Sequence, residues 1–296
     1  MKNNILTCFI VMAIWGSLYP MVKLGYSVFE IYSTGDILTF AGLRFLFCGL
    51  FVILFCLLFK RNDFSALKGN LLPVLAAGFC SIILHYSFSY LGLNLTDGSK
   101  SAILKQTGTV FYICFAALFF KDDKLTARKL IAMLLGIAGI FVINLDQTGF
   151  HFYIGDLLLL LSSFCTVFSN IIYKNVFQKV EPILAAGVAQ FSGGTVLLLV
   201  GLCFGGNAAK LIPRSGIQIL TAGYILAASI ISYCLWYIVV KKQKLSKLYI
   251  IKFSEPLFAA VISAAVLKEN IFQIKYLAAF LLISTGIFIA NRGKAE

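Results

Sequence analysis

Long apolar runs, separated by short polar segments, divide the whole chain. Each run is close to the roughly 20 residues that a helix needs to cross a hydrocarbon core of about 30 Å. The expected spans cover residues 5–25, 36–59, 70–93, 100–120, 129–146, 154–173, 183–204, 216–240, 247–267 and 274–291. The runs do not alternate apolar with polar residues and are long for strands, which excludes a barrel. The pattern predicts an all-α integral membrane protein with ten transmembrane helices.

The composition agrees with a lipid environment. Of the 296 residues, 60% are hydrophobic and only 12% are charged, and the mean hydropathy is +0.93. A soluble protein of this length needs more polar material to cover its surface. Ten spans and their short connections also leave no room for a soluble domain.

The net charge of +13 lies mainly in short loops between the apolar runs. No basic stripe is interleaved with polar residues that read bases, so we predict no nucleic-acid partner. Basic loops are typical of the cytoplasmic side of a membrane. With a cytoplasmic N-terminus, the basic loops at 60–68, 121–129 and 241–247 all fall inside. We therefore predict a multi-pass protein of the cytoplasmic (inner) membrane with both termini cytoplasmic.

The residues that usually bind metals or act as nucleophiles form no recognisable group. The eight cysteines lie in or beside apolar runs without a CxxC pair, and the only histidines are His85 and His151. These cysteines are expected to be buried apolar side chains. HExxH and GxSxG motifs are absent from the sequence, and Asp122-Asp123 has no second acidic cluster. We predict no metal site, no cofactor and no enzymatic activity.

The chain repeats itself. Residues 101–144 align without a gap on residues 248–291, an offset of 147. The same offset pairs polar and aromatic residues, namely Lys105/Lys252, Tyr86/Tyr233 and Tyr90/Tyr237. Because five spans separate equivalent positions, the second half enters the membrane from the opposite side. We predict two inverted-topology five-helix repeats, 1–147 and 148–296, that form one membrane domain. Such repeats are typical of secondary transporters, whose substrate site lies near the midplane between the halves.

Short motifs near the ends of several spans support this interpretation. They are Trp15-Gly16-Ser17 followed by Lys23, Leu43-Arg44-Phe45, Glu255-Pro256 followed by Leu267-Lys268-Glu269, and Gly286-Ile287. Over about residues 5–291 the chain resembles the EamA-type ten-span members of the drug/metabolite transporter superfamily. The resemblance implies two five-helix repeats and transport. The chain departs from the family pattern at Thr109 (usually proline), at Asp122 (usually glutamate) and near Cys165 or Thr166 (usually tryptophan). The superfamily carries many kinds of solute, so these motifs do not indicate the substrate.

Four ionisable residues lie inside the expected spans, where a charge is costly and usually faces a cavity or a partner. Lys105 and Lys252 are predicted to attract an anionic group; the alternative is that both reach back to the membrane interface. Glu255 follows Lys252 by three residues on the same helical face, so it is either neutralised by that lysine or a proton-coupling candidate. Arg44 is a substrate-binding candidate, with an interfacial position or pairing with Asp36 as the alternative.

Polar aromatic residues form the remaining candidates. They are Tyr86, Tyr90, Tyr233, Trp236 and Tyr237, with His85, Tyr19 and Asn170 as further pathway positions. Such rings either line the pathway and contact a cation or serve helix packing and the interfacial belt.

From these observations we expect a secondary transporter that moves a small polar metabolite, such as an amino acid or a related compound, by export or exchange and alternating access. The alternative is an anionic solute, such as an organophosphate or carboxylate, bound by Lys105 and Lys252; a lipid flippase is less favoured. The expected partners are the small-molecule substrate, the lipid bilayer and a coupling proton or counter-substrate, in a monomer or homodimer.

Overall fold

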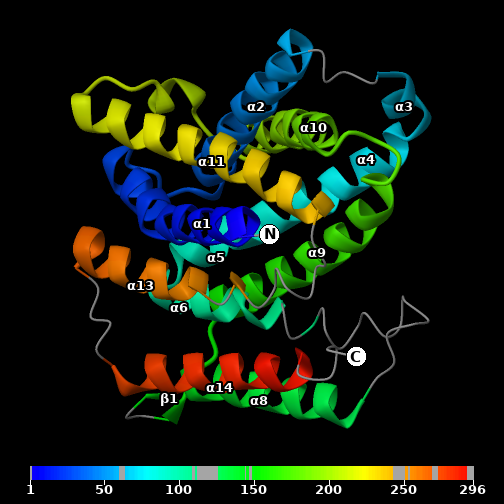
Figure 1. The fold of residues 1–296 in the computed structure, drawn as a ribbon. Coiled ribbons are helices and arrows are strands. Elements are labelled where there is room, and N and C mark those ends of the chain that lie inside the picture. The colour runs from blue at the N-terminus through cyan, green and yellow to red at the C-terminus, as the bar shows by residue number, and fades with distance from the viewer. Residues whose placement is uncertain are drawn as a thin grey trace.

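The structure is a computed structural model that describes residues 2–59, 64–108, 111, 126–143, 145–146, 149–242, 251–252, 254–268 and 273–291. Helices account for nearly all of it (Figure 1). In order they are α1 (Lys2–Val28), α2 (Thr34–Leu58), α3 (Phe64–Gly69), α4 (Leu71–Gly78), the π-helix η1 (Phe79–Leu84), α5 (His85–Asn94), α6 (Gly98–Lys105), α8 (Ala127–Ile143), α9 (Ile154–Val176), α10 (Pro182–Cys203), the 3₁₀-helix η2 (Ala208–Leu211), α11 (Gly216–Lys242), α13 (Ser254–Leu267) and α14 (Ile274–Asn291).

Six of the described helical segments are long and apolar enough to cross a membrane: Leu6–Val28, Thr34–Leu58, Leu71–Asn94, Ile154–Tyr173, Pro182–Cys203 and Gly216–Val239. Three shorter apolar helices, Leu130–Val142, Ser254–Leu267 and Ile274–Gly286, coincide with further expected spans. Parts of the expected spans 100–120 and 247–267 lie outside the described residues. The chain is therefore a helical membrane protein with several spans.

One small difference from the all-helical expectation follows α8. The helix ends at Ile143, before the end of the expected span 129–146, and two short strands follow. They are β1 (Leu145–Asp146) and β2 (Gly149–Phe150), which pair antiparallel with Leu145 opposite Phe150. This hairpin lies between two helices and forms no larger sheet among the described residues.

The starts of three long helices are fixed by capping side chains. Ser33 accepts a hydrogen bond from the Asp36 backbone N–H at 3.0 Å at the start of α2. Glu181 accepts from the backbone N–H of Ile183 at the start of α10, where Pro182 takes a first-turn position. Asp156 accepts from the Tyr153 backbone N–H at 3.0 Å at the start of α9. These oxygens satisfy backbone donors that a helix leaves unpaired, and the carboxylates also favour the helix dipole.

The third expected span is built from α4, η1 and α5 in direct succession. The π-helical turn Phe79–Leu84 widens the helix immediately before His85. Single π-helical turns are uncommon and are frequent at functional sites. His85, the first residue of α5, is buried.

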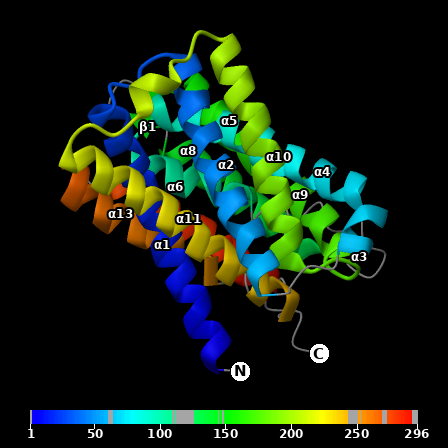
Figure 2. The same cartoon turned by 90° about the horizontal axis from the view of Figure 1, so that it is seen from above.

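Helix packing brings together segments that are far apart in the sequence (Figures 1 and 2). α2 packs along α10, and α8 packs along α14. α1 lies between α11 and α13, while α9 contacts α5 and α6. The cluster of buried side chains around Met12, Phe45 and Leu184 forms the main core, and a smaller one around Leu104, Leu159 and Ile283 connects α6, α9 and α14.

Glycines allow the closest of these contacts. In α2, a Cβ added at Gly42 would overlap the backbone of Leu198 in α10, and one added at Gly194 would overlap the backbone of Leu46. At the α8–α14 contact, a Cβ at Gly139 would lie only 2.6 Å from the Ile283 side chain. Small residues at such contacts let helix backbones approach in a bilayer.

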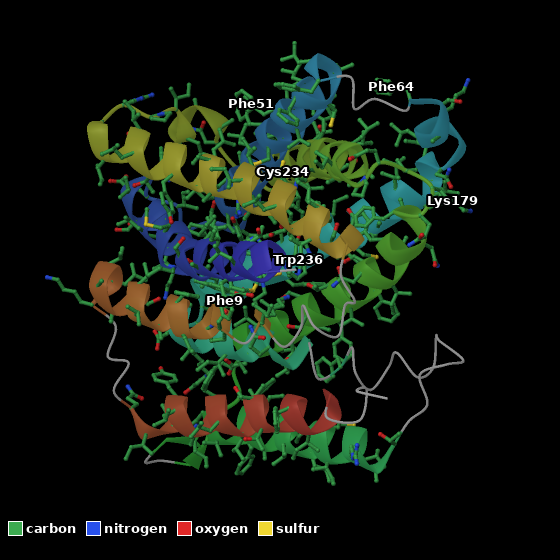
Figure 3. The ribbon with its side chains drawn as sticks, viewed as in Figure 1. Phe9, Phe51, Phe64, Lys179, Cys234 and Trp236 are labelled. Carbon is green, nitrogen blue, oxygen red and sulfur yellow. The ribbon has the colours of Figure 1, made fainter. Side chains whose placement is uncertain are left out.

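Many large apolar side chains among the described residues are exposed on the outer helix faces. Phe9 is 42% exposed and Phe51 is 50% exposed, whereas Trp236 is directed to the interior and is only 6% exposed (Figure 3). A soluble protein would not leave so many rings in water. Lipid is the solvent that suits this surface.

Candidate functional site

One cavity between the helices is lined by every residue that the sequence singled out as a site candidate. They are Tyr19, Arg44, His85, Tyr86, Tyr90, Lys105, Asn170, Tyr233, Trp236, Tyr237, Lys252 and Glu255. The cavity has a volume of about 130 Å³, enough for a small solute or several water molecules. Its walls come from α1, α2, η1, α5, α6, α9, α11, residues 251–252 and α13. That these residues bind a substrate remains a prediction.

Lys105 lies among polar groups of α5. Its ammonium donates to the Ser89 hydroxyl at 2.9 Å and lies 3.3 Å from His85 Nε2. It also lies over the rings of Tyr19 and Tyr86, at 5.5 and 6.0 Å from their centroids. The side chain lines the cavity, and its attraction of an anion stays a prediction.

The contacts of His85 define how its ring is protonated. Its Nδ1 lies 2.8 Å from the carbonyl oxygen of Ser162, which can only accept, so Nδ1 carries the hydrogen. In the neutral ring Nε2 is then an acceptor, and the Lys105 ammonium donates to it. The ring is buried at 8% exposure. His85 therefore acts here as a neutral acceptor that orients Lys105 toward the cavity.

Arg44 is buried and turned toward α5 and α11. Its Nε donates to the Ser229 hydroxyl at 2.7 Å, and its Nη1 donates to the Tyr90 hydroxyl. The guanidinium carbon lies 4.8 Å from the Phe45 ring centroid. The alternative pairing of Arg44 with Asp36 is wrong, because Asp36 contacts residues that follow α10. Two turns of α2 separate the two side chains, and each finds a nearer partner on another helix.

Glu255 is 5% exposed, and its two carboxylate oxygens differ. The Tyr19 hydroxyl donates to Oε1 at 2.9 Å. Oε2 is buried and has no hydrogen-bond partner within the described part of the chain. Tyr19 thus joins the carboxylate to the ammonium of Lys105, which lies over its ring. An unpaired oxygen of this kind is suited to accept from a solute or to hold a proton.

Lys252 contributes its ammonium to the same cavity, 5.8 Å from the ring centroid of Trp15. It is related to Lys105 by the offset of 147 residues. Both ammonium groups lie over an aromatic ring of α1, Trp15 for Lys252 and Tyr19 for Lys105.

Aromatic rings form much of the remaining wall. The hydroxyls of Tyr86 and Tyr233, which the repeat pairs with each other, are in direct hydrogen-bond contact. Trp15 packs on Trp236 with ring centroids 4.9 Å apart. Tyr237 stacks on Tyr233 at 5.9 Å. The tyrosines and Trp236 line the cavity and pack against one another, and their contact with a substrate stays a prediction.

Several lining residues were missed by sequence reasoning. They include Ser81, Ser89, Gln106, Thr166 and Tyr173. Gln106 is 2% exposed, and neither its amide oxygen nor its nitrogen has a partner among the described residues. No group of three or more His, Cys, Asp or Glu side chains suited to a metal occurs in the described ranges.

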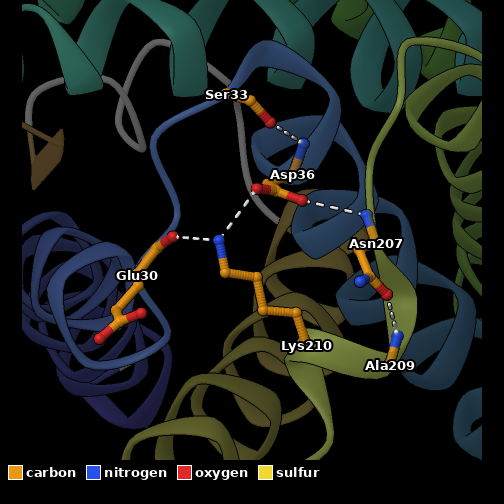
Figure 4. Close-up of polar contacts among 6 residues, drawn as sticks. All are labelled: Glu30, Ser33, Asp36, Asn207, Ala209 and Lys210. Atoms are coloured by element: carbon orange, nitrogen blue, oxygen red, sulfur yellow. Dashed lines mark hydrogen bonds and ion pairs between the residues drawn. The ribbon is translucent and has the colours of Figure 1, made fainter.

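A polar cluster lies apart from the cavity, where the α1–α2 turn meets the segment after α10 (Figure 4). Lys210 donates to the Glu30 carbonyl at 2.5 Å and pairs with the Asp36 carboxylate at 3.3 Å. The other carboxylate oxygen of Asp36 accepts from the Asn207 backbone N–H at 3.0 Å. This cluster ties α2 to the α10–α11 connection.

Comparisons with known proteins agree with this architecture. The chain is 26% identical over 265 residues to the "uncharacterized transporter YetK" of Bacillus subtilis, covering 84% of this chain and 76% of that protein. It is 23% identical over 286 residues to the "uncharacterized inner membrane transporter YedA" of Escherichia coli K12, covering 93% and 87%. One solved crystal structure shares the fold with a TM-score of 0.70, at 17% identity and 97% coverage of each chain. The sequence profile of the EamA-like transporter family matches residues 2–145 and again 153–292. The chain therefore belongs to the EamA-like transporter family.

Proposed function

We propose that this transporter moves a small polar metabolite with an anionic group across the cytoplasmic membrane, by export or exchange. The observation that carries the proposal is the charge of the central cavity. Arg44, Lys105 and Lys252 contribute three cations, and Glu255 is the single acid among the described lining residues. Cations in a low-dielectric cavity attract an anion strongly. The aromatic walls are suited to the apolar part of a small solute.

We infer that the two charge signs favour a metabolite of the amino-acid class. The carboxylate of such a solute would meet Lys105, while its ammonium would meet the unpaired Oε2 of Glu255. Tyr19 contacts both side chains, so the two charges lie close together. A second candidate is a dianionic solute such as an organophosphate, which the excess of cations favours.

Alternating access is part of the proposal and rests on the two inverted repeats, 1–147 and 148–296. The α2–α10 contact supports them. Gly35, Gly42 and Gly49 precede Gly187, Gly194 and Gly201 by 152 residues each. The close pairs across this contact are Gly42/Leu198, Leu46/Gly194, Gly49/Phe191 and Thr39/Gly201. Adding 152 to the number of the α2 residue and subtracting 152 from that of the α10 residue converts the first pair into the second. The same operation converts the third pair into the fourth. A two-fold relation between the halves has this property.

Further support comes from the other helix pairs. α1 contacts α11 and α13, and α9, its equivalent in the second half, contacts α5 and α6. The hydroxyls of the equivalent residues Tyr86 and Tyr233 meet between them. A site between inverted halves is the usual location for substrate in secondary transporters, which expose it by rocking one half against the other.

The test is transport by the purified chain in liposomes. We expect saturable uptake or exchange of an amino acid, with competition by other anionic solutes. The double variant Lys105→Gln/Lys252→Gln should lose this transport while keeping its melting temperature. Saturable transport of a cationic solute that survives the double substitution, with no transport of any anion or amino acid, would overturn the proposal. Preference for a sugar phosphate over amino acids would favour the second candidate.

A further inference from the structure

A second crevice opens between α2 and α11, beside the central cavity, with a volume of about 270 Å³. Its walls are apolar apart from one residue. On α2 they are formed by Phe40, Leu43, Arg44 and Phe47, and on α11 by Ala222 and Gly223. The α2 residues follow the spacing i, i+3, i+4, i+7, so they share one helix face. The crevice thus runs along the helices.

The crevice is open beside Gly223, in the first third of α11. A Cβ added at Gly223 would meet nothing within 4 Å. Phe47 at the crevice wall is 44% exposed, and Ile219, one turn before Gly223, is 60% exposed. Both side chains belong to helices long enough to span the membrane. The mouth of the crevice therefore faces the hydrocarbon of the bilayer.

Arg44 connects this crevice to the central cavity, because it lines both. Its guanidinium has five N–H donors. Two donate to Ser229 and Tyr90, and the other three have no acceptor within the described residues. A 7% exposed cation with unused donors favours an anionic partner. The inner end of an apolar crevice thus carries a positive charge that faces the polar cavity.

We propose that the crevice binds the aliphatic chain of a single-chain anionic amphiphile that enters from the bilayer, with its head group against Arg44. The polar end would lie in the central cavity, and the chain would leave it sideways between α2 and α11. This inference rests on the proposed function, because it extends the anionic solute class to solutes with an apolar tail. Charge complementarity at Arg44 and the apolar walls beyond it select this occupant.

The experiment compares ethyl phosphate with octyl phosphate, which carry the same charge on chains of different length. The full chain is reconstituted in nanodiscs of a zwitterionic phospholipid. Binding is followed by the fluorescence of Trp15 and Trp236, the only tryptophans of the chain, which both line the central cavity. Relative to the ligand free in water, each buried methylene improves affinity by roughly fourfold. We expect octyl phosphate to bind at least about tenfold more tightly than ethyl phosphate.

Two variants fill the crevice, and a third variant is the matched control. In Gly223→Leu, and in Ala222→Leu as a second variant, the octyl-to-ethyl affinity ratio should fall toward one. Gly216→Leu, at the start of the same helix, should keep the ratio of the unsubstituted protein, since a Cβ there also meets nothing within 4 Å. Arg44→Gln should weaken octyl phosphate binding by about tenfold. Melting temperatures show that each variant is folded.

Three outcomes would overturn the inference: no chain-length effect in the unsubstituted protein, an effect that persists in both filled variants, or octyl phosphate binding that ignores Arg44→Gln. A chain-length effect that persists in both filled variants would mean that the octyl chain lies among the lipids around the protein and not in the crevice. If ethyl phosphate binds in a way that depends on Lys105, but without a chain-length effect, the inference about the crevice is wrong and the proposed function stands. If no anion or amino acid binds or is transported, both fail.

Discussion

The α2–α10 contact and the central cavity are both formed between the two halves of the chain, but they treat equivalent residues differently. Along α2–α10 the equivalent positions carry the same residue, glycine, and make the same close backbone contacts. In the cavity the offset of 147 residues pairs Lys105 with Lys252, but it pairs Glu255 with Gly108, so these two lining positions differ.

The difference reflects what each region must do. A contact between two helix backbones requires small residues on both sides, so the packing demand is symmetric. A site for one solute must hold unlike chemical groups, so its two walls differ in polarity. The positions of the α2–α10 contact are therefore the same in both halves, and the cavity positions are the same only in part.

The largest expected effect comes from adding bulk to the glycine contact. Gly42→Leu places a side chain against the backbone of Leu198, where one helix must move away from the other. Overpacking costs about 1–3 kcal/mol of stability even where neighbouring side chains can move aside. A helix backbone moves less easily than a side chain. We expect a sharp loss of monodisperse protein and a lower melting temperature, and the same for the equivalent Gly194→Leu. Gly216→Leu is the control. If both Gly42→Leu and Gly194→Leu keep the melting temperature of the unsubstituted protein, the two helices do not need small residues at this contact.

The two lysines test the cavity side of the comparison. Lys105→Gln removes a charge that donates to Ser89 and His85 and leaves those acceptors without it. A charged hydrogen bond is worth about 1.5–3 kcal/mol, so affinity for an anionic solute should fall by roughly 10- to 100-fold. Lys252→Gln removes the equivalent charge, which lies over Trp15 as Lys105 lies over Tyr19, so we expect a loss of similar size. Binding to the purified protein measures both losses, and an unchanged affinity in either variant would contradict a binding role for that lysine.

Glu255 tests whether the acid of the cavity also carries the coupling proton. Glu255→Gln keeps the size and an oxygen that accepts from the Tyr19 hydroxyl, but it cannot exchange a proton. If the carboxyl carries the coupling proton, transport in liposomes should depend on the pH gradient in the unsubstituted chain and lose that dependence in the variant. Tyr19→Phe, which removes the donor and keeps the carboxyl, should retain a dependence on the gradient. A variant at Glu255 that transports with unchanged proton dependence would exclude the coupling role.

Sequence patterns located the cavity residues because ionisable and aromatic side chains stand out in apolar runs. Lys105, Glu255 and the paired tyrosines interrupt such runs, and a membrane interior forces them toward a common polar space. The partners of these residues could not be read in this way. Arg44 donates to Ser229 on a helix 185 residues later, and only the packing of α2 on α11 brings the two together.

The glycine contact could not be predicted from one segment of the sequence. Gly35, Gly42 and Gly49 recur every seven residues. That spacing matters only when a second helix carries the same period in the antiparallel direction. Gln106 was missed for a related reason, since a lone amide gains meaning only from its lack of a partner in the folded protein.

The smallest expected effect lies at the end of the glycine contact, where the symmetry is broken. Asp36 follows Gly35, and it pairs with Lys210 and with the backbone N–H of Asn207, which lies just beyond α10. Asp36→Asn keeps an acceptor for Asn207 and removes the charge. Lys210 is about one third exposed at its side chain, and ion pairs of this kind contribute about 0.2–1 kcal/mol. We expect a small fall in melting temperature in the variant. High salt screens the ion pair and should lower the melting temperature of the unsubstituted chain, but it should not act in this way on the variant, which lacks the pair. Lys210→Gln should give a similar change, because it removes the other charge of the pair. If Asp36→Asn costs as much stability as Gly42→Leu, this end of the contact, rather than the glycine packing, holds α2 and α10 together.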